Sequence, residues 1–165
     1  MHLKPGPRDQ RPVEARSDVL IYSTPRLPEA VEVTRQITVE LFVNSSAADT
    51  DFTAKLVDVW PDGFAQNLTE GFLPVRYRNS QEKPTFMTPG RTYKVNIDTW
   101  ATSNVFEKGH RIRLEISSSN FPPFDRNTNT GKDIASARVW ATARNAILHD
   151  AEHPSVLMLP IVRRR

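Results

Sequence analysis

The strongest constraint on the fold is the strict alternation of apolar and polar residues from Arg111 to Ser117, directly after a Lys108-Gly109 turn. Successive side chains of a strand point to opposite faces, so this pattern predicts a strand with one buried and one solvated face. The residues expected to face the core are Ile112, Leu114 and Ile116. The residues expected to face water are Arg111, Arg113, Glu115 and Ser117.

The residues after this strand cannot continue it, because Pro122 and Pro123 lack the backbone N–H that a sheet ladder requires. The strand therefore leads into a proline-stiffened loop at one end of a sheet. The loop residues of interest are Phe121, Phe124, Asp125, Arg126 and Asn127. Such a loop either covers the end of its own core or contacts another surface, and the sequence leaves both open.

Short segments with a period of two recur along the chain, with turn signals such as Pro61-Asp62-Gly63 between them. Strands are expected at 19–22, 30–33, 36–43, 52–60, 65–68, 72–78, 91–97 and 156–162, with a break at Glu70-Gly71. Residues 135–149 are expected to form one long strand or a hairpin, although the alanines of 137–148 also allow a helix.

This pattern predicts an all-β fold, an antiparallel β-sandwich of the jelly-roll, galactose-binding-like type. A chain of 165 residues suits a single domain with one core. We expect the sandwich at 17–162, a proline-rich linker or arm at 1–16, and a basic tail at 163–165.

Composition excludes several classes of function. The net charge of +3 is matched by the three arginines at 163–165, so the body lacks the basic surface of a nucleic-acid-binding protein. The absence of cysteine excludes a disulfide, a thiolate nucleophile and a thiolate zinc site. We expect no contact with a membrane and a cytoplasmic location, because the sequence shows neither the apolar core of a signal peptide nor a membrane-helix run.

The hydroxyl and imidazole side chains do not suggest catalysis or metal binding. The serine run 117–119 lies outside any Gly-x-Ser-x-Gly elbow, and a strand separates His110 from Ser118. His149 and His153 share the spacing of helical metal ligands, but a proline follows them and a polar loop is expected.

Three acidic residues lack the dense, glycine-containing loop of a calcium site, and solvated carboxylates are expected at Asp49, Asp51 and Asp58. Tryptophans can line a sugar-binding face, but in a sandwich they more often lie in the core or cover an edge, which is expected for Trp60, Trp100 and Trp140. The sequence therefore predicts no catalytic residue, metal or cofactor in this chain.

Several segments together resemble the C-terminal jelly-roll domain of the Xaa-Pro dipeptidyl-peptidase and cocaine-esterase-like serine hydrolases. They are residues 5–20, 49–63, 108–127 and 149–155, and the third is long and specific. In that family an α/β-hydrolase domain with a helical cap carries the Ser-His-Asp triad and precedes the β domain. No residue of the hydrolase domain is present, so the resemblance implies either an excised domain or a truncated reading frame.

The resemblance further implies that the β domain packs on the hydrolase and cap domains and helps to shape the active-site cleft. The residues expected to dock or to face the cleft are Phe121, Phe124, Asp125, Arg126, Asn127, Trp100 and His110. Two alternative hypotheses remain. The chain could be an autonomous carbohydrate- or ligand-binding module, or it could form a homo-oligomer through the exposed docking face.

Overall fold

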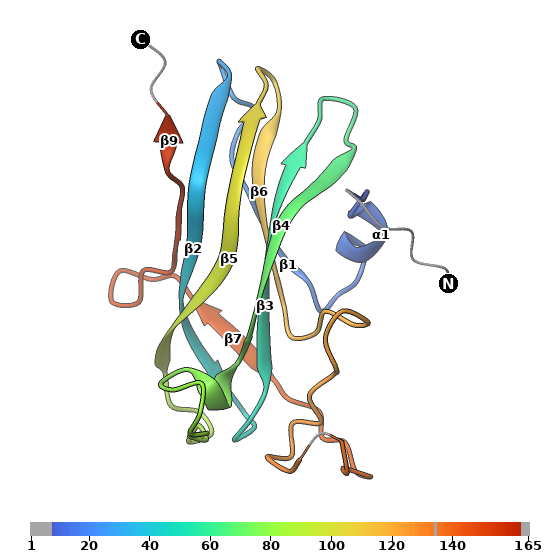
Figure 1. Ribbon diagram of the computed structural model, residues 1–165, viewed down its shortest axis with the longest axis vertical. Coiled ribbons are helices and arrows are strands. Elements are labelled where there is room, and N and C mark those ends of the chain that lie inside the picture. The colour runs from blue at the N-terminus through green and yellow to red at the C-terminus, as the bar shows by residue number, and fades with distance from the viewer. Residues whose placement is uncertain (1–7, 134, 163–165) are drawn as a thin grey trace.

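Two antiparallel β-sheets face each other in the computed structural model, which describes residues 8–133 and 135–162 (Figure 1). Within these residues the first sheet has the order β1-β6-β3-β4, and the second has β5-β2-β7 with β8 and β9 also paired to β2. The elements are α1 (Arg11–Glu14), β1 (Leu20–Ser23), β2 (Val31–Ser45), β3 (Asp51–Val59), β4 (Ala65–Pro74), the 3-10 turn η1 (Val75–Tyr77), β5 (Tyr93–Phe106), β6 (Arg111–Ser117), β7 (Asn145–Leu148), β8 (Val156–Met158) and β9 (Ile161–Val162). The all-β antiparallel sandwich is confirmed, whereas the jelly-roll and galactose-binding-like assignments remain predictions.

The core lies between the inner faces of β2 and β6. The apolar residues of β6 are buried as predicted: Ile112 is 7% exposed, Leu114 8% and Ile116 2%. β2 forms one continuous strand where two were expected, and its alternate residues are also buried: Ile37, Val39, Leu41 and Val43. Burial of each such side chain contributes about 1.5–3 kcal/mol, which is why period-two segments locate the core.

One side of the sandwich is closed by direct contact between β4 and β5. A Cβ atom on Gly71 would lie 2.4 Å from the carbonyl oxygen of Asp98, so only glycine allows this approach. The Thr69 hydroxyl also donates a hydrogen bond to the Thr99 carbonyl. The predicted break at Glu70-Gly71 is therefore wrong, because this glycine continues β4 and permits close packing.

The C-terminal part is less regular than expected. Of the predicted strand, hairpin or helix at 135–149, only β7 forms in the residues that the structure describes. Preceding residues instead bond to a loop, since the Ala141 N–H donates to the Thr128 carbonyl (2.9 Å) and Asn129 Nδ2 donates to the Ala141 carbonyl (2.8 Å). The predicted strand at 156–162 is divided into β8 and β9, with Pro160 between them.

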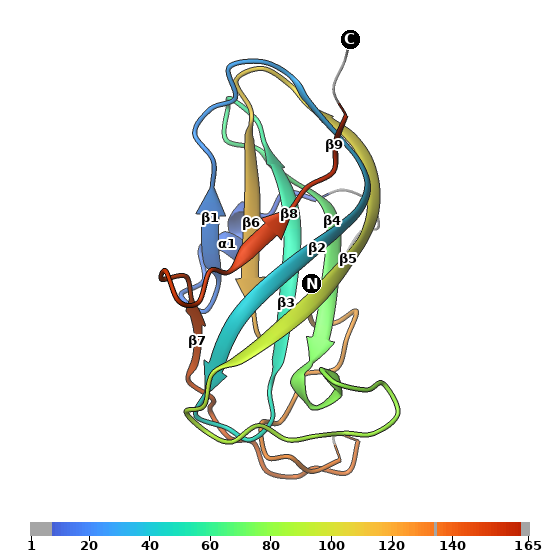
Figure 2. The same ribbon diagram turned by 90° about the vertical axis from the view of Figure 1, so that its left-hand side faces the viewer.

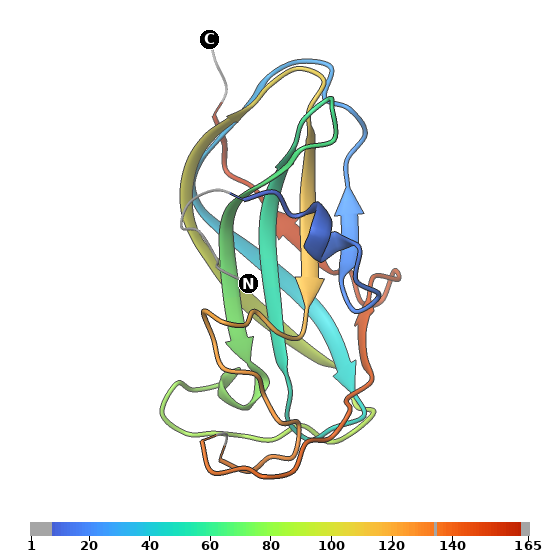
Figure 3. The same ribbon diagram turned by 90° about the vertical axis from the view of Figure 1, so that its right-hand side faces the viewer.

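Part of the outer face of the first sheet, near β6 and β1, is covered by α1 (Figure 3). Arg113 Nη1 on β6 donates to Glu14 Oε2 of α1 at 2.7 Å, and Glu115 is only 2% exposed. Burial, and then the neighbouring Glu14, raises the pKa of Glu115 to about 8. The prediction that Glu115 faces water is therefore wrong, because residues of the expected linker pack over it.

The predicted boundary at residue 17 remains a prediction, and residues 1–7 and 163–165 lie outside the described part. In the described part, no helix has the length and apolar character needed to cross a membrane.

Candidate functional site: the Phe121–Asn127 loop

The loop that follows β6 crosses beside the first sheet, in front of β4 (Figure 3). The ring of Phe124 stacks on the ring of Phe72 in β4, with centroids 4.2 Å apart and planes 8° apart. Phe124 is 38% exposed. One of the two loop phenylalanines therefore covers its own sheet.

The end of the loop is anchored inside the protein by Asn127, which is 6% exposed. Its Nδ2 donates to Asp49 Oδ2 and to Asp51 Oδ1, both at 2.8 Å. Arg76 Nη2 donates to the same oxygen of Asp49 at 2.5 Å. A residue expected at a docking surface is thus an internal anchor that joins the loop to the start of β3.

The expectation of solvated carboxylates is wrong for all three aspartates. Asp49 and Asp51 are fully buried and Asp58 is 5% exposed. Burial raises the pKa of Asp51 from 3.8 to about 7, and the charge of Asp49 adds to this while the Asn127 hydrogen bond opposes it. Burial also raises the pKa of Asp58, against the effect of its hydrogen bond to His110. Contacts from distant parts of the chain cover these groups.

Phe121 and Arg126 on the loop, together with Trp140 from the segment before β7, form a group of side chains that we call the Arg126 cluster. The Arg126 guanidinium carbon lies 5.6 Å from the centroid of the Phe121 ring and 5.2 Å from that of Trp140. Phe121 is 64% exposed and Trp140 is 57% exposed. Cation–π contacts of this kind attract a guanidinium to an aromatic ring without neutralising its charge.

Arg126 makes no hydrogen bond or ion pair within residues 8–133 and 135–162. Its charge is therefore available to a partner. Trp140 was not predicted at this site, because it lies in a segment expected to be a strand. Its aromatic side chain was the one feature of the sequence that could have indicated a role at this site. Its position beside Arg126, however, depends on the path of the whole segment.

Two of the predicted site residues lie elsewhere. His110 precedes β6, at the opposite end of that strand from Ser118 and the loop, and its Nδ1 lies 2.9 Å from Asp58 Oδ1. Trp100 lies within β5, with a φ of 66° and 74% of its surface exposed. Asp125 is exposed on the loop itself. The structure thus brings together the residues 121–127 but not His110 or Trp100.

All three tryptophans are exposed, so none lies in the core; of the two expected positions, an edge is found for Trp100, which lies on the edge strand β5. Trp60 is 42% exposed in the turn after β3, while the other two lie in β5 and in the Arg126 cluster. No ring contact joins any two of them in the described part of the chain. They do not form a common stacking face.

The predicted polar loop at His149 and His153 is confirmed by the bends between β7 and β8. His153 Nδ1 lies 3.0 Å from Asp150 Oδ1. Among the described residues, no group of three or more histidine and acidic side chains could hold a metal ion.

Known proteins are similar to this sequence over almost its whole length. A family profile described as the X-Pro dipeptidyl-peptidase C-terminal non-catalytic domain matches residues 4–158. Cocaine esterase of Rhodococcus sp. (strain MB1 Bresler) is 54% identical over 161 residues, which cover 96% of this chain and 28% of that protein. A putative serine esterase of Mycobacterium bovis is 31% identical over 123 residues, or 64% of this chain and 20% of that protein.

Solved structures of larger enzymes also contain a part that is similar to this chain. An aminopeptidase from a marine sediment Thaumarchaeota archaeon superposes with a TM-score of 0.92 at 31% identity, covering 95% of this chain and 28% of that chain. An α-amino acid ester hydrolase gives 0.91 at 28% identity, covering 94% and 27%. The chain spans less than a third of the length of these relatives. This sequence belongs to the family of X-Pro dipeptidyl-peptidase C-terminal non-catalytic domains.

Proposed function

We propose that this chain is the non-catalytic domain, of jelly-roll type, of a larger α/β-hydrolase that cleaves an ester or amide bond. The names of its relatives, an esterase, an ester hydrolase and an aminopeptidase, support that reaction class. The share of each relative that the chain covers supports its role as one domain of several. In this proposal the catalytic groups belong to the hydrolase domain, and the β-sandwich packs against it.

The observation that carries the docking proposal is the Arg126 cluster. Tryptophan and arginine are the residues most enriched among those that dominate binding energy at interfaces. Here Arg126 is exposed beside Phe121 on a loop that contains Pro122 and Pro123, and Trp140 reaches Arg126 from the segment before β7. Because the loop is stiff, docking it would cost little conformational entropy.

The buried anchor adds a second requirement of a docking loop, a fixed position. Asn127 ties the loop to two aspartates at the start of β3, so its outward residues have one orientation relative to the sandwich. We infer that the hydrolase domain presents an acidic or other acceptor group to Arg126. The loop would then border the active-site cleft and help to shape it.

A domain-replacement experiment tests this proposal. The C-terminal domain of Rhodococcus cocaine esterase is replaced by this chain, and hydrolysis of 4-nitrophenyl acetate and thermal unfolding are measured. We expect an active chimera in which Arg126→Ala or Trp140→Ala weakens domain docking by about tenfold or more. This loss should lower both the melting temperature of the hydrolase domain and kcat/KM.

Trp60→Ala is the matched control, since Trp60 is also an exposed aromatic residue but lies in the turn after β3. It should leave the chimera unchanged, and the 165-residue chain alone should show no turnover. If the Arg126 cluster variants behave like the Trp60 variant, this loop is not the docking site. Turnover by the chain alone would overturn its non-catalytic role.

A further inference from the structure

The two sheets do not meet on the side opposite the β4–β5 contact. On that side lie the edge strand β1 of the first sheet and β7 and β8 of the second (Figure 2). Residues of these strands and of β6 line a pocket of about 510 Å³. This volume lies within the range of about 300–1,000 Å³ that is typical of small-molecule sites. The pocket is distinct from the Arg126 cluster, none of whose residues line it.

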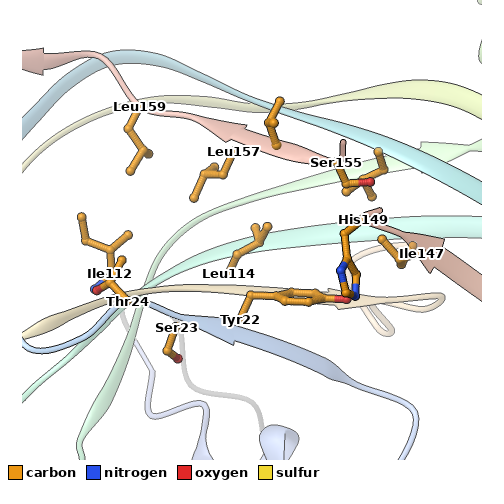
Figure 4. A pocket seen from close by; sticks show the side chains of 12 residues that line it. Tyr22, Ser23, Thr24, Ile112, Leu114, Ile147, His149, Ser155, Leu157 and Leu159 are labelled. Atoms are coloured by element: carbon orange, nitrogen blue, oxygen red, sulfur yellow. The ribbon is translucent and has the colours of Figure 1, made fainter. Parts of the chain in front are cut away.

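The walls of the pocket are apolar and belong to the core. Ile112 and Leu114 from β6 face Leu157 and Leu159 from the β8 segment across it (Figure 4). Leu157 packs against both of the main hydrophobic clusters of the sandwich. An apolar molecule held here would therefore continue the core, and its affinity should grow with the apolar surface that it buries.

One end of the pocket is polar. The rings of Tyr22 and His149 meet edge to face there, with centroids 6.0 Å apart, and both side chains are partly open to solvent (Figure 4). In the described residues neither the Tyr22 hydroxyl nor the His149 ring makes a hydrogen bond. Burial raises the pKa of Tyr22, so its hydroxyl remains a hydrogen-bond donor.

The other polar side chains of the lining already have hydrogen-bond partners. Ser23 Oγ accepts from Arg113 Nε at 2.7 Å, and Thr24 Oγ1 accepts from the Ile112 N–H at 3.1 Å. The Ser155 hydroxyl donates to the Leu148 carbonyl and accepts from the Phe42 N–H at 2.9 Å. The pocket therefore offers an apolar interior and two free polar groups at its mouth. We propose that it binds a medium-chain monocarboxylic acid, with the hydrocarbon tail between β6 and β8 and the carboxylate at Tyr22 and His149.

The first test is a series of straight-chain acids titrated into the chain and followed by NMR. Sodium butanoate, hexanoate and octanoate are compared, and we expect each added methylene to tighten binding by about fourfold. The amide resonances of β1, β6 and β8 should shift saturably, while those of the 121–127 loop should not. Absence of saturable shifts, or affinity that is independent of tail length, would overturn the proposal.

Variants of the mouth and wall complete the test. Tyr22→Phe removes only the hydroxyl and should weaken octanoate binding by about tenfold. Tyr77→Phe, which removes a hydroxyl outside the pocket, should leave it unchanged. Leu157→Phe should reduce binding by occupying the pocket, and the NMR spectrum shows whether the fold is retained. If Tyr22→Phe and Leu157→Phe bind octanoate as tightly as wild type and the Tyr77→Phe control do, the proposal is contradicted.

A protein occupant is distinguished by sedimentation. If a second copy of the chain fills the pocket, a dimer forms that octanoate does not dissociate and that Leu157→Phe disrupts. That result would overturn the proposal of a small-molecule site. A chain whose sedimentation is unchanged by Leu157→Phe, together with saturable octanoate binding, supports it.

Discussion

Individual residues determine how firmly the docking loop is held. Asp49 and Asp51 are fully buried, and the single guanidinium of Arg76 pairs with Asp49. Asn127 bridges both carboxylates. A buried carboxylate is costly when charged, and the raised pKa of Asp51, about 7, expresses that cost.

The raised pKa predicts a pH dependence of stability. Because the folded state holds the Asp51 proton up to about pH 7 and the unfolded chain releases it near 3.8, stability from this group falls as pH rises through that window. Asp51→Asn removes the charge and keeps an oxygen for Asn127. We expect the variant to be more stable than wild type by about 1–3 kcal/mol above pH 7, and to show a flatter pH profile.

Urea unfolding at several pH values measures this difference. Asp125→Asn makes the same substitution at the exposed tip of the loop and should not change the profile. A steeper decline in Asp51→Asn than in wild type would contradict the assignment.

At the level of strands, close backbone approach closes one side of the sandwich. Gly71 of β4 lies where a Cβ would meet both the Asp98 carbonyl and the Ile97 side chain. Gly63 occupies a turn with a φ of 89° and has no atom within 4 Å of an added Cβ. These two glycines are required for different reasons.

This difference predicts unequal costs for the same substitution. Gly71→Ala must displace β5 and should cost about 3 kcal/mol or more in the free energy of unfolding. Gly63→Ala meets only backbone strain and should cost about 1–2 kcal/mol. Chemical denaturation of both variants is the measurement, and equal losses would show that β4 and β5 are not closely packed.

The register shift between β2 and β5 coincides with an unusual backbone conformation at Trp100. Pairing slips between Gln36 and Thr38, and opposite this slip Trp100 takes a positive φ. Asp98 Oδ1 accepts from the Trp100 N–H and Asp98 Oδ2 from Gln36 Nε2, both at 2.8 Å. The bulge thus holds an exposed tryptophan in a conformation that favours glycine.

Comparison of two substitutions isolates that backbone effect. Trp100→Gly relieves the positive φ, whereas Trp100→Ala keeps it. The glycine variant should therefore be about 1 kcal/mol more stable than the alanine variant, which reverses the usual order in a strand. Thermal unfolding of the two proteins provides the test, and the ordinary order, with alanine the more stable, would rule out backbone strain at this site.

For the whole molecule, one side of the sandwich is closed and other surfaces are left for partners. The Arg126 cluster exposes two large aromatic side chains, Phe121 and Trp140, each within cation–π distance of Arg126. Exposed apolar groups of this kind tend to associate when their partner is absent. The proposal of a docking domain therefore has a consequence for the isolated chain.

We expect the isolated chain to self-associate weakly and reversibly, through the Arg126 cluster. Sedimentation velocity over a wide concentration range should show this, and Phe121→Ser should reduce the association. Trp60→Ser serves as the control at another exposed aromatic residue. A monomer at every concentration would contradict the expected association, while the chimera remains the test of docking itself.

The sequence by itself determined the sandwich, the buried face of β6 and the family. These features depend on alternation and turns among neighbouring residues, which each segment carries locally. The tertiary structure alone decided that Asp49 is buried and bonds to a residue 78 positions away, that Gly71 continues β4, and that Trp140 lies beside Arg126. Such contacts follow from how distant segments pack, because a side chain's exposure depends on what the rest of the chain places over it.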